Sequence, residues 1–430
     1  MLASPATVSR RLTLAALAAL GAVGPALAQV RIDIAGYGGS RYPIAIVDFR
    51  DDAKASAQPI AAIVRADLER SGLFRSVDAP AGLSESSSPA WADWKARQAD
   101  ALVAGSITRL ADGRLDIRFK LWDVAKGSEL VGQAQAVHPD DARLAAHRIA
   151  DTIYEKLIGD KGVFATRMAY VTKAGPRYSL VVADADGEGA KVALTSPEPI
   201  ISPAWAPNGR ELAYVSFESR KATVRIQDVQ TGGRRVLADF KGTNSAPAWS
   251  PDGQQLVLSL SREGGTQLFV INRDGSGLRR LTQSGSIDTE ACYSPDGSKI
   301  YFVSDRGGGP QIYRMPASGG SAERVTFSGS YNISPAVSPD GRTLAYITRQ
   351  GGAFRLTVMD LGTGQSQQIS ESSEDESPAF APNGKLIVYA TRAGGKEVLM
   401  TTTLDGKMKT PLLVTLVEVR EPTWGPFTRQ

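Results

Sequence analysis

Residues 248–253 read AWSPDG, and near-copies of this stretch recur through the C-terminal two-thirds of the chain. The copies are AWAPNG at 204–209, CYSPDG at 292–297, AVSPDG at 336–341 and AFAPNG at 379–384. Their prolines are spaced 44 residues apart three times and 43 once, and a degenerate copy, TWGP at 423–426, ends 44 residues after the last of them. A fixed period of this length is typical of propellers, in which each repeat folds as one supersecondary unit.

Each period has the same internal order of strands. An alternating apolar run follows every turn, as in ELAYVS at 211–216, and a glycine-rich loop, another strand and a second turn come next. With the aromatic strand before the turn, the period holds four short strands, the content of one blade. Apolar runs of this type recur near residues 168, 212, 256, 300, 344 and 387, which predicts six blades. The alternative is an open β-solenoid, for which a 44-residue coil is long.

The first blade lacks an innermost strand of its own. Its earliest strand, MAYVT at 168–172, has no aromatic strand and turn before it, whereas the segment 421–427 at the C-terminus has no blade after it. We therefore expect 421–427 to complete the first blade, because this pairing removes two open sheet edges. The propeller is predicted to span 162–430.

Residues 42–161 differ from the repeats and predict a small α/β domain. Residues 44–49 are a buried strand run, and 59–70 carry apolar residues at helical spacing before Gly72. A strand-like run at 73–77, a helix over 91–97 and a meander of three runs at 101–110, 115–123 and 130–137 come next. An amphipathic helix over 140–158 follows, which Gly159 terminates. The predicted fold class is thus a small α/β domain followed by an all-β six-bladed propeller, and the short linker suggests that the two domains touch.

The first 28 residues have the pattern of a signal peptide. Arg10 and Arg11 precede an apolar run over 12–20, and Ala26-Leu27-Ala28 is a small-residue cleavage signal, which places the cut between Ala28 and Gln29. The run is too short for a good membrane span, although an uncleaved anchor is the alternative. Adjacent arginines occur in both general secretory and twin-arginine signals, so the export route stays open.

Charge and residue usage narrow the class of function. The net charge is +4 and falls to +2 without Arg10 and Arg11, and no basic stripe with interleaved aromatics indicates nucleic-acid binding. Cys292 is the only cysteine, so no intramolecular disulfide is possible. Both histidines, His138 and His147, precede the propeller, which therefore holds no Ser-His-Asp set. We expect no enzyme and no cofactor; an exported hydrolase and a generic ligand-binding propeller are the alternatives.

A propeller without catalytic residues usually presents a binding face. The loops between blades lie on the face opposite the Pro-Asp-Gly turns, and acidic loops around one channel mouth would attract a basic partner or a cation. The polar positions of these loops are the candidate partner-binding residues: Thr243, Asn244, Asp288, Thr289, Glu290, Asn332, Asp375 and Glu376.

Local motifs along nearly the whole mature chain resemble one family. They are VRIDI at 30–34, RYPIAIVDF at 41–49, ADLERSGLF at 66–74, FATRMAYV at 164–171, SPAWAPNG at 202–209, LAYVSFES at 212–219 and PTWGPF at 422–427. Together and in this order, they resemble the TolB family of the Tol–Pal system in the Gram-negative periplasm.

The resemblance implies a monomeric, non-catalytic periplasmic adaptor without a membrane span of its own, supporting outer-membrane integrity and cell division. In that family the propeller binds the lipoprotein Pal, and the mature N-terminus binds the C-terminal domain of TolA. By position, the Pal-facing set gains Ala246, and Thr243 stands where the family often has histidine. The flexible TolA-binding segment would be 29–41, beginning Gln29, Val30, Arg31, Ile32, Asp33 and Ile34. The resemblance also allows a cation in the propeller channel.

Overall fold

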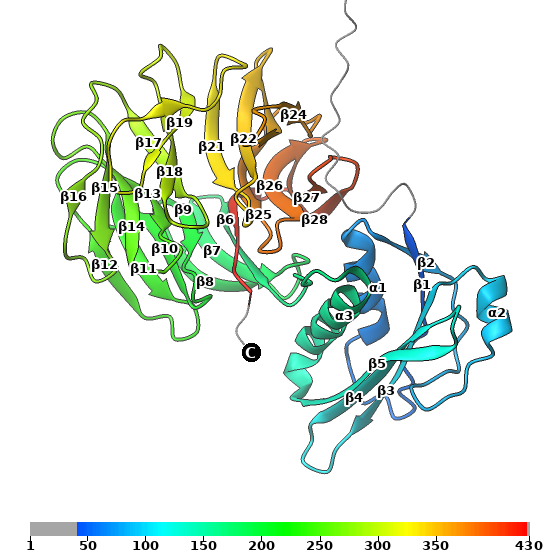
Figure 1. Cartoon of the computed structure of the whole chain (residues 1–430). Coiled ribbons are helices and arrows are strands. Elements are labelled where there is room, and N and C mark those ends of the chain that lie inside the picture. Colours follow the sequence, from blue (N-terminus) through cyan, green and yellow to red (C-terminus); the bar gives the residue numbers. More distant parts are fainter. Residues whose placement is uncertain (1–40, 428–430) are drawn as a thin grey trace, which may run out of the picture. The chain divides into compact units, whose positions relative to one another are not determined.

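The computed structural model describes residues 41–427, in which a five-stranded mixed sheet with three α-helices precedes six four-stranded sheets (Figure 1). The first sheet has the order β2-β1-β3-β4-β5. β1 pairs in parallel with β2 and β3, and β3, β4 and β5 form an antiparallel meander. The elements are β1 (Tyr42–Ile46), α1 (Ile60–Arg70), β2 (Phe74–Val77), α2 (Trp91–Ala96), β3 (Ala101–Arg109), β4 (Leu115–Asp123), β5 (Ser128–Val137), a 3-10 turn (Pro139–Asp141) and α3 (Ala142–Ile158).

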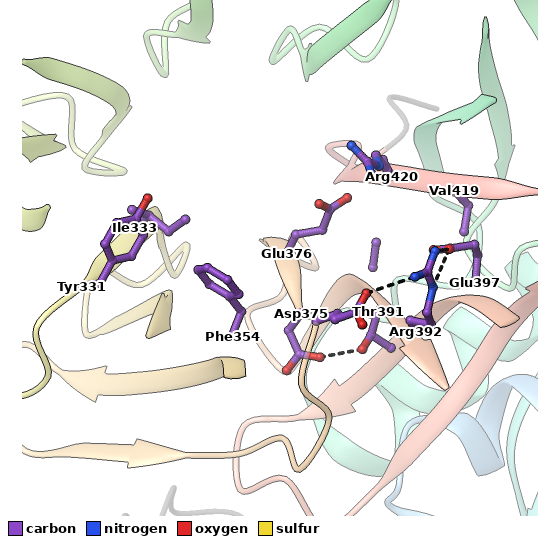
Figure 2. A pocket seen from close by; sticks show the side chains of 12 residues that line it. Tyr331, Ile333, Phe354, Asp375, Glu376, Thr391, Arg392, Glu397, Val419 and Arg420 are labelled. Carbon is purple, nitrogen blue, oxygen red and sulfur yellow. Dashed lines mark hydrogen bonds and ion pairs between the residues drawn. The ribbon is translucent and has the colours of Figure 1, made fainter. Parts of the chain in front are cut away.

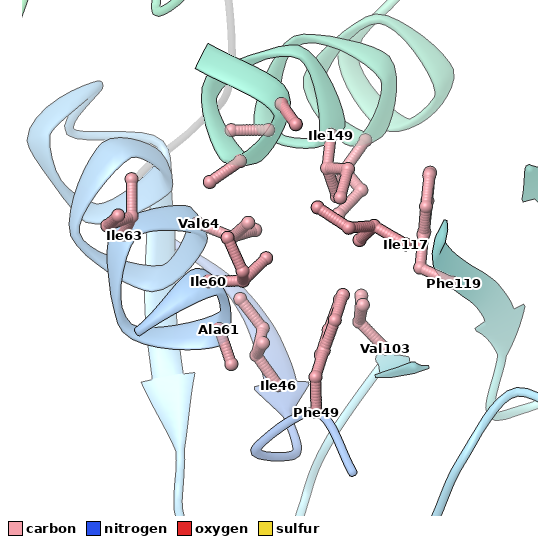
Figure 3. Close-up of a cluster of buried hydrophobic side chains, with 14 of the residues drawn as sticks. Ile46, Phe49, Ile60, Ala61, Ile63, Val64, Val103, Ile117, Phe119 and Ile149 are labelled. Carbon is pink, nitrogen blue, oxygen red and sulfur yellow. The ribbon is translucent and has the colours of Figure 1, made fainter. Parts of the chain in front are cut away.

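Alternation along β1 divides the core of the α/β domain into two layers. Ile44 and Ile46 point toward α1 and α3, whereas Ala45 and Val47 belong to a second cluster on the side of α2. Figure 3 shows the larger layer, where side chains of α1 and α3 meet those of the sheet. Its central members are Ile46, Ile60, Val64, Val103, Ile117, Phe119 and Ile149. The apolar face of each helix, which has helical spacing, therefore packs on the apolar face of the sheet, which has alternating spacing.

Gly105 in β3 is expected to tolerate no side chain. A Cβ atom there would lie 2.4 Å from the carbonyl oxygen of Arg118 and 2.7 Å from the ring of Phe49. Because the carbonyl belongs to the neighbouring strand, Gly105→Ala should lower the free energy of unfolding by about 1–3 kcal/mol, as overpacking does. Urea denaturation measures the loss. Gly285→Ala is the matched control, since nothing lies within 4 Å of its Cβ position; equal stability of both variants would contradict the expectation.

The six blades each contain four antiparallel strands, as predicted. From the inner to the outer strand, the first blade is β29 (Glu418–Trp424), β6 (Arg167–Ala174), β7 (Arg177–Asp184) and β8 (Lys191–Ser196). The second is β9 (Ile200–Trp205), β10 (Glu211–Ser216), β11 (Thr223–Asp228) and β12 (Arg234–Ala238), and the third is β13 (Asn244–Trp249), β14 (Gln255–Leu260), β15 (Gln267–Asn272) and β16 (Arg279–Arg280). The fourth is β17 (Asp288–Tyr293), β18 (Lys299–Ser304), β19 (Gln311–Pro316) and β20 (Glu323–Arg324). The fifth is β21 (Asn332–Val337), β22 (Thr343–Gln350), β23 (Ala353–Asp360) and β24 (Ser366–Gln368), and the sixth is β25 (Glu376–Phe380), β26 (Leu386–Ala393), β27 (Lys396–Thr403) and β28 (Lys409–Thr415).

The inner strands form a closed ring. Each of β9, β13, β17, β21, β25 and β29 contacts the next, and β29 contacts β9. β29, red in Figure 1, pairs antiparallel with β6, so the C-terminal segment completes the first blade as predicted. The register runs from Glu418 opposite Lys173 to Trp424 opposite Met168.

The repeated Pro-Asp-Gly motif also links neighbouring blades. The glycine of each turn has a left-handed backbone, for example φ 71° at Gly253. A Cβ atom on Gly253 would lie 3.6 Å from Pro207, the proline of the preceding turn, and the other turns repeat this contact. Gly209 closes the series against Pro426. The motif therefore recurs because each turn packs on the previous one around the ring.

Candidate partner-binding face

The face of interest is the channel mouth from which the inner strands begin. Every inner strand has a register irregularity near its start, and one residue there adopts a left-handed backbone, which costs about 1 kcal/mol or more outside glycine. These residues are Ser202, Ala246, Glu290, Ser334, Ser377 and Glu421, with φ between 48° and 54°. The strain is repeated once per blade. It bends each strand at the same depth in the channel.

Polar side chains two residues before this bend are buried in four blades. Asn244 is fully buried, and its amide nitrogen donates to the carbonyl oxygens of Phe240 at 2.9 Å and Ala222 at 3.1 Å. Asp288 is also fully buried and accepts a hydrogen bond from Arg306 Nη2 at 2.9 Å. Both side chains hold the loop that enters their blade.

The other two blades repeat this arrangement with different partners. Asn332 Nδ2 donates to Gln311 Oε1 at 2.8 Å, and Asn332 is fully buried. Asp375 accepts from the backbone N–H of Leu356 at 3.0 Å and from Thr391 Oγ1 at 2.7 Å. Removing such a buried acceptor would leave its donors unsatisfied, which costs about 1–3 kcal/mol per group.

The structure places the predicted loop residues in two groups. Asn244, Asp288 and Asn332 begin inner strands, and Asp375 directly precedes one. All four side chains are buried and make hydrogen bonds inside the protein, so each of them helps to hold the backbone of this face. Thr243 is exposed, and Ala246, Thr289, Glu290 and Glu376 are half-buried, so the predicted set divides into supporting and accessible members.

Three glutamates gather around the channel. Glu290 Oε2 accepts hydrogen bonds from the backbone N–H of Ser334 at 2.8 Å and from its hydroxyl at 3.0 Å. Burial raises the pKa of Glu290, and it raises that of Glu376 as well. At Glu421, burial together with repulsion from Glu376 and Glu290 raises the pKa to about 7, although the backbone N–H of Ser202 offsets part of this. The channel therefore holds carboxyl groups that would gain from a nearby positive charge.

A cavity of about 440 Å³ opens at the mouth between β21, β25 and β29 (Figure 2). Figure 2 shows Tyr331 and Phe354 on one side and Arg420 with Val419 on the other. The remaining lining residues are Ile333, Glu374, Asp375, Glu376, Ala390, Thr391, Arg392 and Glu397. Aromatic surface thus lies beside carboxylates, a combination suited to a partner that carries both apolar and basic groups.

A second cavity, of about 330 Å³, adjoins the first at β29. Arg420 lines both cavities, and Glu418, Glu421, Lys173 and Tyr178 also line the second one. Lys173 lies 3.7 Å from Glu418 as an ion pair and 5.5 Å from the ring centroid of Tyr178. The strand that closes the propeller therefore separates two depressions of the same face.

Large apolar side chains are exposed on the loops around this mouth. Phe327 is 74% exposed and Leu416 is 83% exposed, and Ile287 and Val417 accompany them. Arg324 lies over the ring of Phe327 at 5.3 Å, which fixes one end of its loop. Ile287 and Phe327 lie on successive loops between blades, whereas Leu416 and Val417 lie on the loop between β28 and β29. Exposed apolar side chains on these loops make the face a candidate protein-binding surface.

Sequence reasoning missed several of these side chains. The loop residues Phe327 and Leu416, and Arg420 and Glu421 of β29, were not singled out as candidate binding residues. Their position at the mouth depends on how segments of different blades are arranged. A signal was present for Glu421, since it occupies the same repeat position as the predicted Glu290. For Phe327 and Leu416 the only hint was an apolar residue within a loop.

Several predictions lie outside the described residues. The cleavage site at Ala28 and Gln29 and the segment Gln29, Val30, Arg31, Ile32, Asp33 and Ile34 belong to the part of the chain not described. Within residues 41–427, no helix is long and apolar enough to cross a membrane. Cys292 lies on β17, where burial raises the pKa of its thiol to about 12. A low thiolate content follows, which disfavours a reactive cysteine.

Comparison with known proteins identifies the family. A model described as the TolB beta propeller domain matches residues 154–428, and one described as the TolB amino-terminal domain matches residues 30–130. This chain belongs to the TolB family. The family assignment agrees with the resemblance of the local motifs and with the prediction of a non-catalytic protein.

Individual TolB proteins agree with this assignment. The Tol-Pal system protein TolB of Albidiferax ferrireducens is 61% identical over 198 residues, which cover 46% of each chain. That of Polaromonas sp. is 59% identical over 217 residues, or 50% of each chain. The chain thus spans about half the length of these curated relatives in the matched segments. The crystal structure of TolB from Acinetobacter baumannii is 39% identical, covers 91% of this chain and 98% of its own, and has a TM-score of 0.82.

Proposed function

We propose that this TolB-family chain is a periplasmic adaptor whose propeller face binds Pal and whose N-terminal segment binds TolA. The observation that carries the Pal part is the mouth of the propeller, where two cavities, buried carboxyls and exposed Phe327 and Leu416 share one face. A partner could place basic side chains near the buried carboxyls and apolar side chains against Phe327 and Leu416. Outer-membrane integrity and cell division are the processes we expect this adaptor to support.

The supporting network gives the face a rigid frame. Arg306 is held between Asp288 and the rings of Phe302 and Tyr313, whose centroids lie 5.3 and 5.0 Å away. Arg392 is paired with Glu397 and, at 3.4 Å, with Glu374. Side chains fixed in this way lose little conformational entropy when a partner docks, which favours binding.

A channel cation is part of the proposal in a minor role. Glu290 and Glu421 are three blades apart, so they approach the channel from opposite sides, and Glu376 lies beside Glu421. A bound cation would favour ionisation of these carboxyls. The proposed adaptor role requires no bound cofactor.

A generic ligand-binding propeller is the second candidate. The cavity of about 440 Å³ lies within the range of small-molecule sites, roughly 300–1,000 Å³. A small ligand would not require the exposed apolar loops outside the cavity, and this favours a protein partner.

Deleting residues 29–41 is expected to abolish TolA capture and to leave Pal capture intact. The proposed TolA segment precedes β1 in the chain, whereas the strands of the propeller begin at Arg167. Purified mature protein and the deletion variant would be immobilised and tested with the periplasmic domain of Pal and the C-terminal domain of TolA, with circular dichroism as the folding control. Retained TolA binding would contradict the N-terminal site. Absence of Pal binding by the intact protein would contradict the propeller site.

A further inference from the structure

A buried histidine joins the α/β domain to the first propeller blade. His147 on α3 is completely buried, and its Nδ1 lies 2.6 Å from Asp67 Oδ2 on α1. Its Nε2 lies 3.8 Å from a carboxylate oxygen of Asp184, the last residue of β7, and 3.8 Å from one of Asp186 in the turn that follows. At this distance Nε2 has no hydrogen-bond partner, so its attraction to the two propeller carboxylates is electrostatic.

Arg143, one turn earlier on α3, reinforces the same contact. Its Nε lies 3.2 Å from Asp184 Oδ2, and its Nη2 pairs with Asp186 Oδ2. Two cationic positions of the α/β domain therefore meet two carboxylates of the propeller. All five groups belong to one compact unit of the chain.

The spacing of Asp67, His147 and Asp186 would also suit a metal ion, since one ligand atom from each lies within 4.8 Å of the others. However, the Asp186 oxygen that faces His147 is the one that pairs with Arg143. A divalent cation would have to sit beside a guanidinium that is always charged, which is unfavourable. The contacts favour a charged imidazole over a metal.

We propose that His147 in its imidazolium form is the centre of an ionic clamp that docks the α/β domain on the first blade. One ring nitrogen is held by Asp67 inside the α/β domain, and the other faces Asp184 and Asp186 of the propeller. Deprotonation removes the positive charge of the imidazole, so that Arg143 is then the cationic member of the clamp that still pairs with Asp184 and Asp186. The clamp therefore makes domain docking sensitive to pH, independently of which partners the protein binds.

The charges around the imidazole support its protonation. Burial alone would lower the pKa of His147, but the carboxylates of Asp184, Asp67 and Asp186 outweigh burial and raise the pKa from 6.5 to about 9. The other charged groups nearby are Arg143 and Asp151 on α3, Arg70, which pairs with Asp67 at 2.9 Å, and Arg167 on β6, which interacts with Asp184.

The sign of the pH dependence follows from this shift. A histidine whose pKa is raised by folding contributes stability that is complete below the unfolded value of 6.5 and is lost as the pH rises to about 9. A rise of this size corresponds to a factor of up to about 300 in the folding equilibrium. The docked state should therefore weaken across the range from pH 6.5 to 9, while it is insensitive to pH just below this range.

The test uses the full mature chain with His147→Gln, the double variant Asp184→Asn with Asp186→Asn, and His138→Gln as the matched control. His138 is exposed and lies outside the clamp, and the chain has no third histidine. Imidazole carbon-13 NMR from pH 6 to 10 then gives two signals, and the one absent from His147→Gln belongs to His147. It should remain protonated to about pH 9.

Calorimetry gives the second readout. At pH 6, His147→Gln should lower the unfolding midpoint of the α/β domain by about 10 °C and separate it from the propeller transition, as expected for a broken buried ion pair. The propeller-side double variant should separate the transitions too, which keeps the test decisive if His147→Gln fails to fold. Above pH 9 the difference from wild type should shrink.

Three results would overturn the clamp. The first is deprotonation of His147 near pH 6.5. The second is coincident unfolding in both clamp variants and the His138→Gln control. The third is stabilisation of wild type, but not of His147→Gln, by added Zn²⁺ or Mn²⁺, which would identify a metal site instead.

Discussion

A chain that ends at Thr415 is expected to lose the cooperative unfolding transition of the propeller. Such a chain lacks β29, the inner strand of the first blade, and exposes the hydrogen-bonding edge of β6. It also removes Trp424, whose indole N–H donates to Thr166 Oγ1 at 2.8 Å, and it breaks the contact between Gly209 and Pro426. β6, Thr166 and the turn at Gly209 would all lose a partner. The loss in free energy of unfolding should therefore approach the whole stability of the propeller, about 5–15 kcal/mol.

Urea denaturation followed by tryptophan fluorescence measures this loss. A chain that ends at Phe427 is the matched control, because it keeps β29 complete. Trp424→Ala is a graded test with an expected cost of about 3–5 kcal/mol, as for other buried aromatic truncations. If the chain ending at Thr415 unfolds with the midpoint and slope of the control, closure by the C-terminal strand does not stabilise the fold.

The double variant Phe327→Asp with Leu416→Asp is expected to weaken Pal binding at least about 100-fold without changing the unfolding midpoint. Both side chains are largely exposed, so their replacement removes no core packing. If both side chains are buried in the complex, their removal should cost about 3 kcal/mol or more of binding free energy. The two new negative charges would also oppose docking. Isothermal calorimetry with the periplasmic domain of Pal measures the affinity.

The control for this variant is Val192→Asp. Val192 is 62% exposed, but it lies on β8, the outermost strand of the first blade, away from the channel mouth. The control should bind Pal like wild type. Equal affinity of the double variant and the control would place the Pal site elsewhere on the protein.

The repeat explains why the fold was predictable. The Pro-Asp-Gly turns and alternating strands are local patterns, and repetition at a fixed period confirms each copy through the others. The repeat also predicted the place of the C-terminal strand. The first blade lacks an inner strand and the C-terminal segment is a strand without a blade, so the two are expected to pair. In the α/β domain, the helical spacing of Ile60, Ile63, Val64 and Leu68 likewise matched α1.

The arrangement of the candidate face could be derived only in part from the sequence, for a physical reason. A polar residue in a loop has the same sequence signal whether it faces solvent or holds the backbone. Asn244 and Asp375 hold the backbone, which became visible only with their partners at positions 222, 356 and 391. Phe327 and Leu416, in contrast, resemble ordinary apolar residues, and their exposure depends on how two loops leave their blades.

His147 shows the same limit more strongly. The sequence predicts the amphipathic helix that contains it, and α3 confirms that helix. The charge of His147, however, depends on Asp67 at a separation of 80 residues and on two aspartates, one at the end of β7 and one in the turn that follows. No local pattern connects these positions.

The sequence by itself determined the six-bladed propeller, its closure and the α/β domain, because these depend on periodic patterns of turns and apolar residues. The tertiary structure alone decided which loop residues are supports and which are exposed, and it alone brought His147 to the propeller. Those properties arise from contacts between distant segments, where burial and opposing charges change what a residue can do. Periodicity specifies a fold, whereas the chemistry of a site depends on its neighbours in space.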